Sequence, residues 1–285
     1  MRLLVVGDFH GKLPLNLKAI VKKEKIGLII SLGDYFPFSY RKIWFKHCYG
    51  KDLELWEVLG KKVVKTYMLK DLKVGENILK KLNDLGVPVL TVVGNTDLSR
   101  LNDQYRPGRS FNYKWKWESQ EFFTPMIKKY KNIHRIDYSS FKFGNIIFIG
   151  AFGHSSPGHV KSRAYKKYKN KLENLFKKFR KENKEGKVIF TTHNVPFNTK
   201  LDKITAKHAH HRARGKHYGS KMFRRIIEKY QPSLSIGGHI HEGFGKDKIK
   251  STLLVNPGAA LEKRYAIIEI PEKKGKIDVK LLKKK

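Results

Sequence analysis

Short apolar runs, each ending beside a glycine and a polar side chain, recur along this sequence. Residues 3–6, 28–32 and 87–93 are runs of strand length, and segments with helical spacing of their apolar residues lie between them. Continuous apolar runs are typical of strands that are buried on both faces. Strands that alternate with helices predict parallel strands joined by crossovers. The pattern therefore predicts an α/β architecture.

The second half of the chain repeats this pattern. We expect further strands at residues 145–149, 188–192, 233–236, 252–255, 266–270 and 277–281, and helices at 13–24, 74–85, 164–184 and 216–229. No internal repeat and no low-complexity linker marks a domain boundary. The sequence therefore predicts one domain over residues 1–285, with two sheets packed face to face, helices outside, and insertions at about 35–72 and 98–130.

Composition limits the class of protein. A hydrophobic content of 40% excludes a disordered chain. Cys48 is the only cysteine, so an intrachain disulfide is excluded and a reducing compartment is expected. No apolar run approaches the ~20 residues needed to span a bilayer, and the first residues lack the pattern of a signal peptide. We therefore expect a cytoplasmic protein that does not enter a membrane.

The chain is strongly basic, with 61 Lys and Arg residues against 25 Asp and Glu residues and a net charge of +36. Such a charge is typical of proteins that bind nucleic acid, because lysine and arginine neutralise phosphates and release counterions. A lysine-rich composition also results from AT-rich coding sequence. The charge therefore leaves nucleic-acid binding and genome composition as alternatives.

Polar clusters follow five of the predicted strands. The side chains that could carry chemistry are Asp8, His10, Asp34, Asn95, His193, His239 and His241. Sites in α/β sheets gather beyond the carboxyl ends of strands, so we expect these clusters to converge on one crevice. Residues two apart in an extended chain project to the same side. Asp8 and His10 should therefore face a shared centre, as should His239 and His241.

The residue types in these clusters indicate a metal centre. A mixture of carboxylate, amide and imidazole donors suits Mn, Fe, Zn or Co better than Ca. The donors are too many for one ion and suit two ions if one carboxylate bridges them. Asp34 is the candidate bridge, because each of its two oxygens can face a metal. A neutral Asn95 preserves positive charge for an incoming phosphate.

The ordered series D-x-H, G-D, G-N-x-D, a single His after a strand, and G-H-x-H resembles the calcineurin-like metallophosphoesterases over roughly residues 1–241. This resemblance implies a four-layer αββα sandwich of two mixed β-sheets flanked by helices. It also implies two divalent metal ions, with Mn favoured and Fe, Zn, Co or Ni as alternatives. One ion would bind Asp8, His10, Asp34 and His241, and the other would bind Asp34, Asn95, His193 and His239.

The resemblance further implies an enzyme that hydrolyses phosphate esters. A hydroxide bridging the metals would attack phosphorus in line with the leaving oxygen, with Asp34 positioning this nucleophile and Asn95 contacting the phosphate. The segments at residues 192–196 and 238–242 look closest to prokaryotic phosphodiesterase-type members. The implied substrate is a phosphodiester or a nucleotide.

Position 96 departs from the family pattern. Many members carry a histidine where this chain has Thr96, held by the acid equivalent to Asp97. Threonine cannot donate a proton near neutral pH, so we expect a preference for diesters or activated leaving groups. Thr96 and Asp97 remain candidate substrate contacts, and Asp97 alternatively ties its loop. His217 resembles part of a G-x-H-x-G-S element in similar members, and we expect it to contact the substrate phosphate or donate a proton.

Two other functions fit parts of the sequence. The chain could be a metal-dependent nuclease acting on RNA or DNA, or a non-catalytic scaffold that binds nucleic acid through its basic surface. Residues 105–117 mix basic and aromatic residues and form either a lip that stacks bases or a packed excursion. The aromatic residues at 35–56 predict a hydrophobic lid or a dimer contact, and His208–His211 either an extra metal site or an exposed loop.

Overall fold

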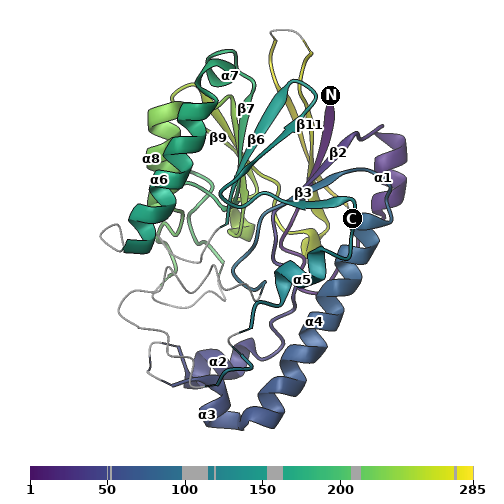
Figure 1. The fold of residues 1–285 in the computed structure, drawn as a ribbon, viewed down its shortest axis with the longest axis vertical. Coiled ribbons are helices and arrows are strands. Elements are labelled where there is room, and N and C mark those ends of the chain that lie inside the picture. The colour runs from purple at the N-terminus through teal and green to yellow at the C-terminus, as the bar shows by residue number, and fades with distance from the viewer. Residues whose placement is uncertain are drawn as a thin grey trace.

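The computed structural model describes residues 1–49, 51, 53–97, 115–118, 120–152, 163–206, 213–272 and 275–284. Two six-stranded sheets pack face to face, and helices cover both outer faces (Figure 1). This arrangement confirms the predicted four-layer αββα sandwich.

The first sheet has the strand order β12-β11-β1-β2-β3-β4. Its parallel strands are β1 (Arg2–Val6), β2 (Leu28–Ser31), β3 (Val89–Thr91) and β4 (Ile133–Arg135). β11 (Arg264–Glu269) pairs antiparallel with both β1 and β12 (Asp278–Lys283). The sheet is therefore mixed, and its parallel strands carry the first polar clusters beyond their carboxyl ends.

The second sheet has the order β5-β6-β7-β8-β10-β9. Its parallel strands are β6 (Ile146–Ala151), β7 (Val188–Asn194), β8 (Leu234–Gly238) and β10 (Thr252–Asn256). The antiparallel edges are β5 (Ser140–Phe143) and β9 (Gly245–Ile249). The carboxyl ends of β7 and β8 carry the remaining clusters.

Side chains alternate between two cores because successive residues of a strand point to opposite faces. In β1, Leu3 and Val5 belong to a core that also holds Phe148 and Ile236 of the second sheet, and this core lies between the sheets. Leu4 and Val6 belong to a core that includes residues of the covering helices. Burial on both faces explains why β1 is apolar throughout.

The outer layers consist of helices. α1 (Leu17–Lys23), α4 (Lys61–Asn83) and α5 (Phe123–Ile127) lie on the side of the first sheet, and α6 (Arg163–Lys178) and α8 (Lys221–Tyr230) lie on the side of the second (Figure 1). α7 (Arg180–Lys184) follows α6. Two 3₁₀ turns, η2 (His241–Gly243) and η3 (Ala260–Glu262), come after β8 and β10. Among the described helices, none combines the length and the apolar character that crossing a bilayer requires.

Helix boundaries differ from the predicted ones for local reasons. The expected helix at 13–24 begins only at Leu17, where the side chain of Asn16 accepts the N–H of Ala19 at 3.1 Å. The expected helix at 216–229 begins at Lys221, and the hydroxyl of Ser220 caps it. The expected basic helix at 164–184 is two helices, because Phe179 leaves helical geometry.

Much of the predicted insertion at 35–72 is helical. α2 (Arg41–His47), α3 (Leu55–Leu59) and the first half of α4 project from the sheets (Figure 1). They enclose a small core of Cys48, Leu55, Val64 and Met68, against which Trp56, Trp115 and Trp117 pack. The two aromatic segments thus pack on each other at these positions. Residues 98–114 of the second insertion lie outside the described residues, as do His208–His211.

Candidate metal centre

The seven side chains expected to bind metal lie where the carboxyl ends of strands from both sheets meet. Asp8, Asp34 and Asn95 follow β1, β2 and β3 of the first sheet, whereas His193 lies in β7 and His239 and His241 follow β8. Within the described residues, two sets of three donor groups have ligand atoms within 4.8 Å of one another. The first set is Asp8, His10 and His241, and the second is Asp34, His193 and His239.

Asp34 lies between the two sets. Its Oδ2 is 3.6 Å from Nε2 of His10 and 3.6 Å from Nε2 of His193. Its Oδ1 accepts the backbone N–H of Thr96 at 2.8 Å and the hydroxyl of Thr96 at 3.0 Å. A single oxygen of Asp34 therefore faces both sets, which differs from the expectation that each oxygen would face its own metal.

Asp8 is fully buried, and its two oxygens have different surroundings. Oδ2 accepts the backbone N–H of His239 at 3.0 Å. Oδ1 has no hydrogen-bond partner and lies 3.7 Å from Nε2 of His241. A buried carboxylate oxygen without a partner is unfavourable, because it has lost its water and gained no donor.

His193 is held in one orientation by the backbone. Its Nδ1 lies 2.6 Å from the carbonyl oxygen of Leu32, which can only accept, so Nδ1 carries the proton. Nε2 then points at Oδ1 of Asn95, 3.0 Å away. When His193 is neutral, both of these atoms are acceptors, and their contact is favourable only with a proton or a cation between them.

The backbone at these positions is unusual. Asp8, His10, Asp34 and His239 have φ values of 54°, 43°, 58° and 68°, in the left-handed region that non-glycine residues rarely adopt. Strain of this kind concentrates at functional sites. These residues lie beyond the strands rather than in extended chain, yet Asp8 and His10 fall in one donor set as expected, whereas His239 and His241 fall in different sets, against the expectation of a shared centre.

Gly94 allows the close approach of Asp34. A Cβ atom at position 94 would overlap Oδ1 and the backbone nitrogen of Asp34. Glycine is therefore required where the loops after β2 and β3 cross.

Burial and mutual charge set the protonation of the donors. Burial lowers the pKa of His239 to about 3 and also lowers the pKa of His10, so both imidazoles are neutral. Burial alone would raise the pKa of Asp8 and Asp34, but neighbouring imidazoles, first His241 for Asp8 and His193 for Asp34, outweigh it and lower both carboxyl pKa values. The same carboxylates raise the pKa of His241 and His193 against the effect of burial, so a bound metal ion would have to displace a proton from these two rings. Neutral imidazoles and ionised carboxylates are the forms that ligate metals.

Asp97 is buried beneath the site. Its oxygens accept the backbone N–H groups of Asp34 at 2.8 Å, Tyr35 at 2.7 Å and Gly94 at 2.8 Å. Burial and the nearby charge of Asp34 raise the pKa of Asp97 to about 7. Asp97 thus joins the loops that follow β2 and β3.

His217 forms a pair that the sequence did not predict. Its Nδ1 lies 2.7 Å from Oδ1 of Asp202, a fully buried carboxylate. Asp202 is an isolated acid in a loop, and no motif distinguished it. Glu262, whose Oε1 lies 3.8 Å from Nδ1 of His241, was also missed.

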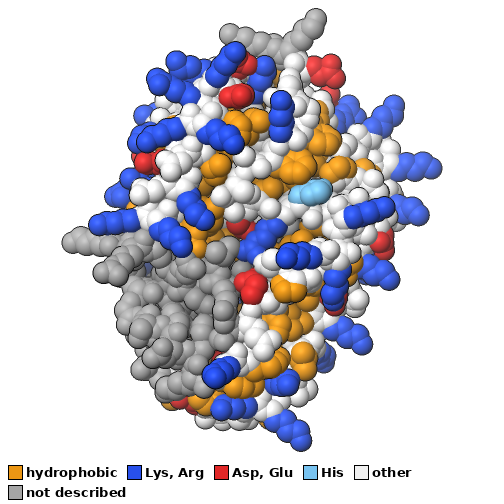
Figure 2. Space-filling model, viewed as in Figure 1, with side chains coloured by type: hydrophobic (Ala, Val, Ile, Leu, Met, Phe, Trp, Pro, Cys, Tyr) orange, Lys and Arg blue, Asp and Glu red, His pale blue; other side chains and the backbone are white. Residues whose placement is uncertain are grey.

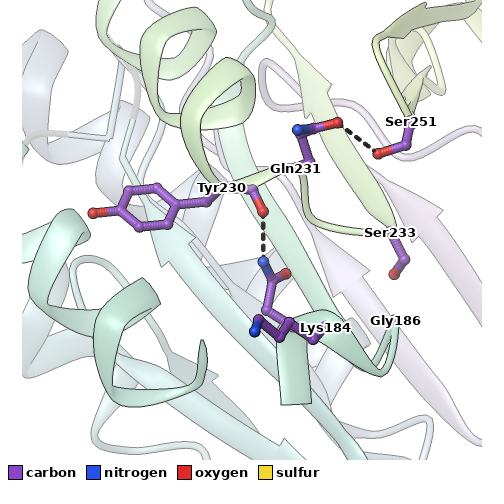
Figure 3. A pocket seen from close by; sticks show the side chains of 7 residues that line it. Lys184, Gly186, Tyr230, Gln231, Ser233 and Ser251 are labelled. Carbon is purple, nitrogen blue, oxygen red and sulfur yellow. Dashed lines mark hydrogen bonds between the residues drawn. The ribbon is translucent and has the colours of Figure 1, made fainter. Parts of the chain in front are cut away.

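A separate open pocket of about 410 Å³ lies at the opposite ends of β7 and β10 (Figure 3). Gln231 lines it and accepts a hydrogen bond from Ser251 at 2.9 Å. None of the predicted site residues lines this pocket.

A family model and a relative among curated proteins match this chain. A model of a family described as calcineurin-like phosphoesterase matches residues 1–243. An uncharacterized protein of Methanocaldococcus jannaschii is 25% identical over 261 residues, which are 90% of this chain and 88% of that protein.

Solved structures share the fold. One crystal structure has a TM-score of 0.68 at 17% identity and covers 98% of both chains. A dimetal phosphatase from Danio rerio has a TM-score of 0.57 at 11% identity, covering 99% of this chain and 95% of that one. The protein TT1561 of Thermus thermophilus has a TM-score of 0.55 at 14% identity, covering 98% of each.

Proposed function

Because this chain belongs to the calcineurin-like phosphoesterase family, we propose that it is a dinuclear metal-dependent phosphodiesterase. The observation that carries this proposal is the position of Asp34 Oδ2, 3.6 Å from Nε2 of both His10 and His193. One carboxylate oxygen between two donor sets is placed where it could bridge a pair of ions.

We assign one ion to Asp8, His10, Asp34 and His241, and the other to Asp34, Asn95, His193 and His239. Bonds of about 2.1 Å at tetrahedral or octahedral angles separate two ligands of one ion by about 3.0–3.4 Å. The distances of 3.6 Å at Asp34 and 3.7 Å between Asp8 and His241 are close to this range. The donors therefore fit metal ions with a small inward movement.

Two further contacts support the fit. A cation beside Asp8 would give its unpartnered Oδ1 a counter-charge. A cation between Nε2 of His193 and Oδ1 of Asn95 would make the contact of these two acceptors favourable. The mixture of oxygen and nitrogen donors suits Mn first, with Fe, Zn, Co or Ni as alternatives.

Divalent ions bound here would lower the pKa of water and draw negative charge from the phosphoryl oxygens. The chain itself contributes orientation: Asp34 aims Oδ2 at the centre, and Asn95 is placed to contact the phosphate. Asp97 acts indirectly, by tying the loops that carry these residues. The hydroxyl of Thr96 donates a hydrogen bond to Oδ1 of Asp34. The position where many members have histidine therefore supplies no proton to a leaving group. We therefore propose a preference for diesters over alkyl monoesters.

A substrate panel tests the proposal. Protein loaded with Mn, Co, Ni or Zn should hydrolyse bis(p-nitrophenyl) phosphate faster than p-nitrophenyl phosphate. Asp34→Ala should abolish hydrolysis, whereas the matched control Asp278→Asn, on the edge strand β12, should keep it. A loaded wild-type protein that is inert toward both esters with all four metals would contradict the proposal.

A nuclease activity is the second candidate, and the net charge of +36 favours it. Lys and Arg side chains are scattered over the described part of the face shown in Figure 2 and outnumber the Asp and Glu side chains there. Affinity for RNA or DNA should fall steeply with added salt, whereas hydrolysis of a small diester should respond weakly. If the wild-type protein turns over no ester and Asp34→Ala leaves nucleic-acid binding intact, the chain is a binding scaffold instead.

A further inference from the structure

The Asp202–His217 contact fixes the tautomer of His217. A carboxylate can only accept, so Nδ1 of His217 carries the proton that is shared at 2.7 Å with Oδ1 of Asp202. Nε2 is then the ring nitrogen that can exchange a proton, on a side chain that is 33% exposed. A buried acid behind a partly exposed histidine is the arrangement that orients a general acid or base.

Asp202 is itself rigidly held. Oδ1 also accepts the backbone N–H of Thr199 at 2.8 Å, and Oδ2 accepts the backbone N–H groups of Asn198 at 2.9 Å and Gly219 at 3.0 Å. These donors stabilise the negative charge of a carboxylate that is fully buried. The orientation of His217 is therefore set by the fold rather than by a mobile side chain.

The pair adjoins the segment that carries His193. Asn194, the next residue, donates from Nδ2 to the carbonyl oxygen of Tyr218 at 3.1 Å. Tyr218 directly follows His217 in the chain. His217 is therefore next in sequence to Tyr218, whose carbonyl oxygen bonds to Asn194, and Asn194 is next in sequence to the proposed metal ligand His193.

The pair also adjoins the segment that carries His241. Glu242 accepts the backbone N–H of Ala206 at 3.1 Å. Gly243 packs so tightly on the carbonyl oxygen of Leu201 that a Cβ atom would overlap it. Leu201 directly precedes Asp202. The loops that carry Asp202 and His217 therefore contact both the segment after His193 and the segment after His241.

We propose that His217 protonates the leaving oxygen at this site and that Asp202 is its positioning residue; this inference rests on the proposed phosphodiesterase function. The pair supplies the function that the loop at Thr96 and Asp97 lacks, because Thr96 bonds to Asp34 and Asp97 bonds to backbone N–H groups.

The proposed step conserves atoms and charge. As the attacking oxygen bonds to phosphorus, the bond from phosphorus to the leaving oxygen breaks, and its electron pair moves to that oxygen. The leaving oxygen takes the proton from Nε2 of protonated His217. The neutral imidazole keeps the proton on Nδ1, hydrogen-bonded to Asp202. A proton from solvent then replaces the one that Nε2 has lost.

Leaving-group dependence tests this role. Bis(p-nitrophenyl) phosphate expels a stable phenolate that needs no acid, whereas a dithymidine phosphate expels an alkoxide that does. We expect His217→Asn to lower kcat for dithymidine phosphate about 100-fold, the usual size of a general-acid effect, and to change kcat for the aryl diester by less than about 3-fold. The Asn amide can still donate to Asp202, so this variant should fold. His47→Gln, on the projecting helix α2, is the matched control.

A readout that does not depend on turnover tests the positioning. In ¹⁵N spectra of imidazole nitrogens, wild-type protein should show His217 with its proton on Nδ1, and Asp202→Asn should shift this tautomer balance. Metal content should stay at the wild-type value in both His217→Asn and Asp202→Asn, because neither residue is a proposed ligand. Asp278→Asn should leave the spectra unchanged.

The possible outcomes separate the two proposals. Equal losses on both diesters, or no loss on either, in an active and folded His217→Asn protein would overturn the inference and leave the phosphodiesterase proposal standing. A wild-type protein inert toward both diesters with every metal would overturn the phosphodiesterase proposal and the inference together. A selective loss on dithymidine phosphate, with unchanged metal content, would support both.

Discussion

Thr96 holds Asp34 through two hydrogen bonds to one oxygen: the backbone N–H at 2.8 Å and the hydroxyl at 3.0 Å both reach Oδ1. With Oδ1 engaged, Oδ2 is the oxygen presented to His10 and His193. Thr96 thus orients the carboxylate that we propose as the bridge.

This relationship predicts the effect of removing the hydroxyl. Thr96→Val keeps the shape and the backbone N–H but loses one donor to Asp34, so metal affinity should fall about 10-fold, as it does when partners of ligating groups are removed. Thr96→Ser should bind metal like wild type. Competition with a chelating dye measures the affinity, and equal binding by all three proteins would contradict this role of Thr96.

Removing metal should lower the stability of the fold. Asp8 and Asp34 are buried carboxylates, and a bound ion adds RT ln(1 + [L]/Kd), or about 2.7 kcal/mol at a free concentration 100 times Kd. Chelation should therefore lower Tm, and adding back Mn should restore it. A Tm that does not respond to either treatment would argue against ions at these residues.

Asp97→Ala should strongly destabilise the protein. The change leaves the buried N–H groups of Asp34, Tyr35 and Gly94 without their acceptor, which should lower the free energy of unfolding by about 3 kcal/mol or more. Urea denaturation measures this, with Asp278→Asn as the exposed control. A loss below about 1 kcal/mol would show that water or another group replaces the carboxylate.

Gly75→Ala tests the packing of α4. Alanine normally favours a helix over glycine by about 1 kcal/mol. At position 75, however, a Cβ atom would overlap the ring of Phe36, and overpacking usually costs about 1–3 kcal/mol. We expect net destabilisation in urea, whereas Lys70→Ala, on an exposed position of the same helix, should be neutral or slightly stabilising.

Glu173 should make the free energy of unfolding decrease as the pH falls into the acid range. Burial tends to raise the pKa of Glu173, but Lys229 at 3.1 Å and Lys169 at 3.4 Å outweigh it, and the net shift of the pKa is downward. A carboxyl with a lowered folded-state pKa stabilises the fold above its unfolded-state pKa of about 4.3, and this stabilisation is lost as the pH falls through the folded-state pKa.

The free energies of unfolding of wild type and Glu173→Gln should therefore differ at pH 7, by less than about 1 kcal/mol, and converge once the pH has fallen below the folded-state pKa of Glu173. Added salt should reduce the difference at pH 7. Glu185→Gln, which removes an exposed pair with Lys187, is the control and should show a smaller difference. A difference that persists in acid would contradict an ionic origin.

The strands could be predicted where they are apolar on both faces, as in β1 and β7, because burial alone then fixes their composition. β4, β5 and β9 were missed, since they are short edge strands with charged or half-exposed residues. The length of α4 was also missed, because its first half packs on the projecting helices and on Trp115 and Trp117, away from the two sheets.

The sequence by itself determined which side chains could ligate metal and in what order the strands deliver them, because donor chemistry and apolar burial are local properties. Tertiary structure alone decided that Oδ2 of Asp34 faces both donor sets and that Asp202 orients His217. The Thr96–Asp34 contact spans 62 residues of chain. Such contacts depend on how two sheets and their left-handed loop residues meet in space, and no local pattern of residues encodes that meeting.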